Sequence, residues 1–176
     1  MNTIKFESVL IIGMGLMGSS LSRALNHFKI SNNIYGIDTN QKVIDKCKSL
    51  NLIKDGAKNI NSFDQQFDLI VICSPLSTYK EIFTYLNKFT TDLTLLTDIG
   101  STKLSVVDDY NSAIDNKNII FLPSHPIAGL EKSGPEFGLA KLFENRFCII
   151  TPLIKDDLRI NPIIEMWKSI GMKIEI

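Results

Sequence analysis

Short apolar runs alternate with amphipathic segments along the whole of this chain of 176 residues. The runs are rich in Val, Ile and Leu, as expected of strands that are buried on both faces of a parallel sheet. Between the runs, apolar residues recur at helical spacing, for example Tyr79, Ile82, Phe83 and Leu86. This alternation predicts an α/β fold with a doubly wound, mostly parallel sheet of Rossmann type and helices on both faces.

The positions of these runs predict the individual elements. Strands are expected at 9–12, 34–37, 68–73, 94–99, 118–122 and 146–151, with a short strand near Lys58 and a final edge strand at 172–176. Helices are expected at 19–28, 41–50, 103–115 and 157–170, and one more after Ser74-Pro75, since proline suits a first helical turn. A loop rich in Pro and Gly is expected at 123–138, after which the strand at 146–151 resumes the sheet.

The first apolar run leads directly into the pattern Gly13-x-Gly15-x-x-Gly18. Gly13 permits a tight turn out of the strand, and Gly15 has no Cβ to obstruct the phosphates of a dinucleotide. Gly18 lets the next helix lie close to the sheet with its N-terminal amides facing the anion. Leu16 and Met17 lie inside this loop and are predicted, with the glycines, to bind the cofactor.

Three glycines alone would also fit an ordinary turn, but the surrounding sequence favours dinucleotide binding. Asp38 ends the second apolar run twenty residues after Gly18, where this fold places the acid that accepts hydrogen bonds from the adenosine ribose. Its carboxylate would repel the additional phosphate of NADP, and the cation that follows, Lys42, is several positions away, so NAD is favoured. Asp38 could also cap the helix that begins near Asn40, and the two roles are compatible.

Composition excludes several classes of function. Nineteen basic and nineteen acidic residues cancel, so nothing favours nucleic acid or an anionic membrane surface as a partner. The N-terminus lacks a signal-peptide pattern and no run is long enough to span a bilayer, so we expect one cytoplasmic domain over 1–176. The cysteines show no metal-ligand spacing, which predicts reduced thiols and no metal at Cys47, Cys73 and Cys148.

In such a sheet the ligand binds at the carboxyl ends of the strands. Besides the glycine loop and Asp38, the expected ends are Cys73-Ser74-Pro75, Asp98-Ile99-Gly100-Ser101 and Ser124-His125-Pro126. Because of this placement, Cys73, Ser74 and Pro75 are predicted to bind the cofactor.

The polar chemistry of these strand ends centres on His125. Its ordinary pKa of ~6.5 suits removal of a proton from a hydroxyl at neutral pH. The other histidine, His27, ends the first predicted helix and is expected at the surface. Ser101 could orient the imidazole or bind substrate, or it could cap the helix that begins near Lys103.

Two segments carry a resemblance to a known family. Asp98-Ile-Gly-Ser-Thr-Lys103 and Ser124-His-Pro-Ile-Ala-Gly-Leu-Glu-Lys-Ser-Gly134 together resemble the signatures of prephenate and arogenate dehydrogenases. The resemblance covers essentially the whole chain, as the N-terminal nucleotide-binding domain of that family. It implies NAD-linked oxidative decarboxylation of prephenate to 4-hydroxyphenylpyruvate, or of arogenate to tyrosine, in tyrosine biosynthesis and without a metal.

The resemblance also implies roles for single residues. His125 matches the histidine that hydrogen-bonds the ring hydroxyl and acts as the base, and Ser101 matches the serine that contacts this histidine and the nicotinamide side of the site. Glu131 matches an acidic residue near the substrate side chain, although a glutamate in a loop can simply be solvated. Ser124, which precedes the histidine, is also assigned to the substrate site.

Family members continue into a helical domain that forms the homodimer and supplies an arginine and a second histidine to the substrate site. We expect that domain to be absent from these 176 residues. No arginine here is well placed to replace its clamp: Arg23 and Arg159 lie in predicted helices and Arg146 opens a strand. Two alternatives stay open. One is another small-molecule NAD(P) dehydrogenase of this fold, such as a hydroxyacid dehydrogenase or imine reductase, and the other is a non-catalytic NAD-binding sensor or partner domain.

Overall fold

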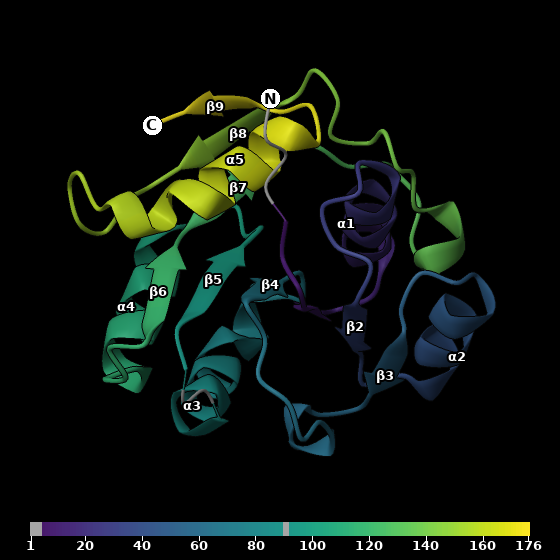
Figure 1. The fold of residues 1–176 in the computed structure, drawn as a ribbon, viewed down its shortest axis with the longest axis horizontal. Coiled ribbons are helices and arrows are strands. Elements are labelled where there is room, and N and C mark those ends of the chain that lie inside the picture. The colour runs from purple at the N-terminus through teal and green to yellow at the C-terminus, as the bar shows by residue number, and fades with distance from the viewer. Residues whose placement is uncertain (1–4, 90–91) are drawn as a thin grey trace.

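A six-stranded parallel sheet forms the centre of the structure, a computed structural model that describes residues 5–89 and 92–176 (Figure 1). Its strand order is β3-β2-β1-β4-β5-β6, the order of two βαβ halves wound in opposite directions from β1 and β4. The strands are β1 (Val9–Ile12), β2 (Ile34–Ile37), β3 (Asp55–Ala57), β4 (Leu69–Ile72), β5 (Thr94–Asp98) and β6 (Ile119–Leu122). The predicted doubly wound parallel sheet is confirmed.

Helices cover both faces of this sheet, as the continuous apolar strands require. Val9 and Ile11 of β1 face the cluster that holds α1, α2 and α5, whereas Leu10 and Ile12 face the cluster that holds α3 and α4. The α-helices are α1 (Leu16–His27), α2 (Gln41–Ser49), α3 (Tyr79–Phe89), α4 (Leu104–Ala113) and α5 (Asn161–Ser169). Single 3₁₀ turns occur at η1 (Ile60–Ser62), η2 (Leu76–Thr78), η3 (Pro135–Phe137) and η4 (Leu158–Ile160).

A second, three-stranded sheet corrects two of the predictions. The segment 123–138, predicted as a loop, contains β7 (Ser124–Pro126), and the strand predicted at 146–151 does not rejoin the main sheet. It is β8 (Phe147–Ile150), which pairs with β7 in antiparallel fashion and with β9 (Lys173–Glu175) in parallel. Pro123 lies between β6 and β7 and has no N–H to continue the ladder, so the chain changes sheets there.

The long connection from β7 to β8 crosses the molecule and packs on α1 (Figure 1). The amide of Leu139 donates to Ser20 Oγ at 3.1 Å, and Arg23 donates to the carbonyl of Pro135 at 3.2 Å. The small sheet is thereby tied to the helix that follows the glycine loop.

Both sheets share one core. Trp167 of α5 is fully buried with its ring 5.9 Å from that of Phe143, and the same cluster contains Cys148 of β8 and Val71 of β4. The second sheet is therefore packed on the six-stranded sheet as part of the same folded unit.

This shared core predicts a large effect of truncating its biggest side chain. Trp167→Ala is expected to lower the free energy of unfolding by ~3–5 kcal/mol, because it removes contacts between α5 and both sheets. The matched control is Leu104→Ala, at a side chain 80% exposed, which is expected to change stability by less than about 0.5 kcal/mol. Urea unfolding followed by circular dichroism measures the free energy of unfolding of both variants. A loss in Trp167→Ala as small as that in the control would mean that α5 is not part of the core.

Candidate functional site

The glycine loop is shaped by close contact between the ends of β1 and β4. Gly13 has φ +97°, and a Cβ added there would lie 2.6 Å from the nitrogen of Ser74 and 2.7 Å from the carbonyl carbon of Cys73. A Cβ at Gly18 would overlap the carbonyl oxygen of Gly13. These two glycines are therefore required by the protein's own packing.

Gly15 differs, because nothing in the protein requires it to be glycine. Its φ of −67° is ordinary, and a Cβ there would meet no atom within 4 Å. The space beside Gly15 is open, as needed for a ligand that approaches the backbone.

The N-terminus of α1 also lacks a side-chain cap among the described residues. Gly15 is its N-cap and makes no side-chain hydrogen bond, and the first turn, which begins with the half-buried Leu16 and Met17, carries no acidic residue. By contrast, α2 is capped by Asn40, whose side chain accepts a hydrogen bond from the amide of Lys42 at 3.0 Å. Uncapped amides and the positive end of the helix dipole favour an anion at α1.

Asp38 links the glycine loop to the end of β2. Its Oδ2 accepts a hydrogen bond from the amide of Met14 at 3.0 Å, and its Oδ1 accepts one from the amide of Asn40 at 2.9 Å. The alternative role of Asp38 as the cap of α2 is wrong, because Asn40 is that cap. The carboxylate is half-buried and holds the glycine loop in place while it borders the cavity described next.

A cavity of about 450 Å³ lies between the end of β2 and helix α3. Four predicted cofactor residues line it: Gly13, Asp38, Ser74 and Pro75. Apolar side chains form much of the remaining wall, and its polar members include Lys58, Thr78 and Glu81, which the sequence did not point to. This volume and mixed lining suit one nucleoside half of a dinucleotide.

The residues at the end of β4 contribute in different ways. Ser74 Oγ lies 2.8 Å from Thr78 Oγ1, whose hydroxyl also bonds the carbonyl of Pro75, so the chain entering η2 is held rigidly. Cys73 contacts the glycine loop through its backbone, and burial raises the pKa of its thiol. All three cysteines are free, as predicted, and burial raises the pKa of Cys47 to about 11.

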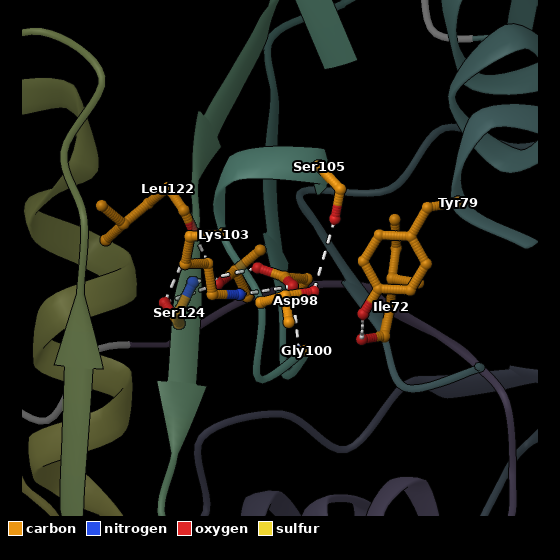
Figure 2. Close-up of polar contacts among 10 residues, drawn as sticks. Ile72, Tyr79, Asp98, Gly100, Lys103, Ser105, Leu122 and Ser124 are labelled. Atoms are coloured by element: carbon orange, nitrogen blue, oxygen red, sulfur yellow. Dashed lines mark hydrogen bonds and ion pairs between the residues drawn. The ribbon is translucent and has the colours of Figure 1, made fainter. Parts of the chain in front are cut away.

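A second polar group lies where β5 ends and the chain passes into β7 (Figure 2). Asp98 is fully buried and accepts hydrogen bonds from Lys103 Nζ at 2.6 Å, from the amide of Gly100 at 2.9 Å and from the amide of Ser124 at 3.0 Å. The buried carboxylate therefore ties three segments together at one point.

His125 is the middle residue of β7, opposite Ile149 of β8, and its side chain is partly exposed. Burial is the main cause that lowers the pKa of His125 below its ordinary value, and the nearby charge of Lys103 lowers it further, while Asp98 acts in the opposite direction. The imidazole is consequently neutral at pH 7 and able to accept a proton.

Among the described residues, the structure shows no contact that assigns a catalytic or substrate role to the other residues predicted for this site. Ser101 is exposed, and within the described part of the chain its side chain makes no recorded hydrogen bond to His125; it does not cap α4, whose N-cap is Lys103. Ser124 is fully buried, and its hydroxyl bonds the hydroxyl of Thr97 and a backbone carbonyl. Glu131 lies exposed in the loop after β7. The substrate roles of these residues stay predictions.

The cavity lies at the end of β2, and His125 follows the end of β6 by three residues, at the start of the second sheet. Four strand spacings of about 4.8 Å separate β2 from β6, roughly 19 Å in all. The glycine loop lies between them, so an elongated ligand with a central anionic group fits this arrangement.

None of the helices within residues 5–89 and 92–176 has the length and apolar content that a bilayer crossing requires. No group of three or more His, Cys, Asp or Glu side chains in that part of the chain is arranged to hold a metal ion.

A sheet of order β3-β2-β1-β4-β5-β6, with an open glycine loop and an uncapped helix at its centre, defines a dinucleotide-binding domain of Rossmann type. Residues 21–176 match the sequence model of one such family, described as "Prephenate dehydrogenase, nucleotide-binding domain". The chain belongs to this family.

Relatives agree with this assignment. The chain is 30% identical over 172 residues to a cyclohexadienyl dehydrogenase of Zymomonas mobilis, covering 97% of this chain and 58% of that protein. It is 33% identical over 158 residues to a prephenate dehydrogenase of Bacillus subtilis, covering 89% of this chain and 42% of the other. The chain thus spans about half the length of the curated relatives it matches.

A solved structure is similar over almost the whole chain. It is prephenate dehydrogenase from Aquifex aeolicus in complex with hydroxyphenyl propionate and NAD⁺, with a TM-score of 0.90 and 33% identity. The match covers 99% of this chain and 60% of that one.

The contrast between Gly13 and Gly15 predicts unequal effects of the same substitution on stability. Gly13→Ala is expected to cost ~1–3 kcal/mol of unfolding free energy from its backbone conformation alone, with further loss from the clash with the end of β4. Gly15→Ala is expected to stay within about 1 kcal/mol of the wild type, because its Cβ enters open space. Thermal or urea unfolding of the two variants tests this, and equal losses would contradict it.

Proposed function

We propose that this chain is the NAD-binding part of a dehydrogenase that oxidatively decarboxylates prephenate or arogenate. The observation that carries the proposal is the open space at Gly15 beside the end of α1, which has no side-chain cap. The neutral, partly exposed His125 of β7 supports it. The NAD⁺ and hydroxyphenyl propionate bound by the Aquifex aeolicus relative support it.

The residues of this chain suit separate parts of the cofactor. The cavity beside Asp38 would take the adenosine half, and the carboxylate of Asp38 would accept hydrogen bonds from the ribose hydroxyls. The amides at the start of α1 would bind the pyrophosphate. NAD⁺, when bound, supplies the hydride acceptor.

His125 would perform the proton transfer. Its neutral imidazole accepts the proton of the ring hydroxyl as hydride leaves the same carbon, and loss of CO₂ from the opposite ring position completes the aromatic ring. Because aromatisation supplies the driving force, the protein needs chiefly to orient the ring and to accept one proton.

Recognition of a substrate with two carboxylates calls for a cationic clamp. Arg23 is engaged with the carbonyl of Pro135, Arg159 pairs with Asp157 at 2.7 Å, and Arg146 is exposed before β8. We therefore propose that the clamp and the homodimer contacts lie in the part of the relatives that this chain does not span, and that these 176 residues alone turn over neither substrate appreciably.

The cofactor proposal predicts a preference for NAD over NADP. Calorimetric titration of the chain is expected to give an NADP affinity weaker by about tenfold or more, or ~1.4 kcal/mol, since Asp38 would repel the additional phosphate. Lys58 lines the same cavity, and its positive charge would act against this repulsion.

Asp38→Ser is expected to reduce the difference in affinity between NAD and NADP. It should also weaken NAD binding, because the amide of Met14 loses its hydrogen-bond acceptor. The exposed Asp45 of α2 lies outside the cavity, so Asp45→Ser is a matched control that should leave the ratio unchanged. Equal affinities of the wild type for the two nucleotides would overturn the assignment to NAD.

The role of His125 is tested in a longer protein, in which this chain is joined to the segment that its relatives have in addition. His125→Asn is expected to keep the fold and the NAD affinity while lowering kcat by ~10²-fold to 10⁴-fold. The pKa of His125 is lowered, so the wild-type rate should be constant at neutral pH and fall as the pH drops below about 6.5, and the variant should lack this dependence.

His27→Asn, at the exposed end of α1, is the control and should retain full activity. A loss confined to KM in His125→Asn would mean that this residue holds the substrate and does not accept its proton. Full activity with an unchanged pH profile would place the base elsewhere.

A further inference from the structure

Asp98 is a buried charge at the centre of the His125 end of the site. Its side chain is fully buried and has three donors, two of them backbone amides from the Gly100 turn and from Ser124 (Figure 2). A buried carboxylate is costly unless its hydrogen bonds are satisfied, so these amides are held firmly. Ser124 immediately precedes His125, so an anchored Ser124 backbone also fixes the position of the His125 backbone.

Lys103 supplies the third donor and the balancing charge. Its side chain is only 16% exposed, and its Nζ lies 2.6 Å from Asp98 Oδ2. A buried ion pair seldom stabilises a fold more than apolar residues of the same volume would, because both charges lose their hydration. The stability of the fold therefore does not explain why an ion pair occupies this position. An effect of the pair on the neighbouring His125 would explain it.

Among the described residues, the charges that act on His125 are those of Lys103 and Asp98 from the β5–α4 connection, and Cys148 lies on the paired strand β8. Glu175 of β9 is opposite Ile149 and therefore two strands away from His125. Burial raises the pKa of Cys148 to about 12, so this thiol is neutral. Tyr79, which lies near Asp98, is also neutral because burial raises its pKa. Lys103 and Asp98 are thus the charged groups that shift the protonation of this imidazole within the described part of the chain.

We propose that Asp98 and Lys103 form a positioning pair for His125, in which the carboxylate anchors the backbone of Ser124 and the ammonium balances the carboxylate so that the imidazole stays unprotonated. Neither residue needs to touch the substrate. The link to catalysis rests on the proposed function, but the position and protonation of His125 do not.

Removing each partner has a distinct consequence. Without Lys103, His125 faces a carboxylate with no balancing charge and loses a nearby cation, and both changes favour the imidazolium. Without Asp98, the Ser124 amide is released and the strand that carries His125 loses its anchor. The first change alters protonation and the second alters position.

The test is a pH titration of the histidine ring signals by NMR on this 176-residue chain, without nucleotide or substrate. The chain has two histidines, so His27 serves as an internal reference. In Lys103→Met, the proton affinity of His125 is expected to rise about threefold or more, while that of His27 is unchanged. Lys103→Arg retains the charge and should leave His125 close to the wild type.

A control variant separates this effect from the loss of any ion pair. Lys48→Met removes the exposed Lys48–Asp55 pair, whose atoms are 2.7 Å apart on the α2 side of the molecule, and it should leave His125 unchanged. An unchanged His125 titration in a folded Lys103→Met variant would overturn the proposal.

If Lys103→Met does not fold, hydrogen exchange of the wild type decides. The Ser124 amide should then exchange as slowly as the amides of β5, because it donates to a buried carboxylate. Rapid exchange of this amide would overturn the proposal. Because no turnover is measured, the result does not depend on whether the chain belongs to an active dehydrogenase.

Discussion

The close approach of the ends of β1 and β4 is the constraint on which the rest of the site depends. The chain leaves β1 toward one face of the sheet and leaves β4 toward the other, so a crevice opens between the two strand ends. Gly13 has a positive φ and leaves no room for a Cβ beside Ser74 and Cys73, and this turn directs α1 back against the sheet with its amides toward the crevice. The site for an anion therefore follows from backbone packing.

Carboxylates hold the two halves of the site in the same manner. At the nucleotide half, Asp38 accepts a hydrogen bond from the amide of Met14. At the His125 half, Asp98 accepts one from the amide of Ser124. Asp38 borders the cavity and is half-buried, so its charge is available to a ligand. Asp98 is fully buried and requires Lys103 to balance it. The same chemistry thus serves recognition at one end and positioning at the other.

Local patterns predicted most of the main sheet. Its central strands are continuous apolar runs, and such runs are distinctive because both faces of a parallel sheet are buried. Phe147–Ile150 was predicted as a strand for the same reason, but was placed in the wrong sheet. The sheet that a strand joins depends on where Pro123 interrupts the hydrogen-bond ladder and on contacts between residues distant in sequence. A local pattern does not encode such contacts.

The sequence by itself determined the strand ends, the glycine loop, Asp38 and His125, because each is marked by residue type at a fixed spacing from an apolar run. The tertiary structure decided which of these residues meet. It brought Lys58 into the cavity with Asp38, turned the Ser124 hydroxyl inward and joined Asp98, Lys103 and the Ser124 amide. These contacts join segments from different strands, and only the packed sheet fixes how far apart such side chains lie.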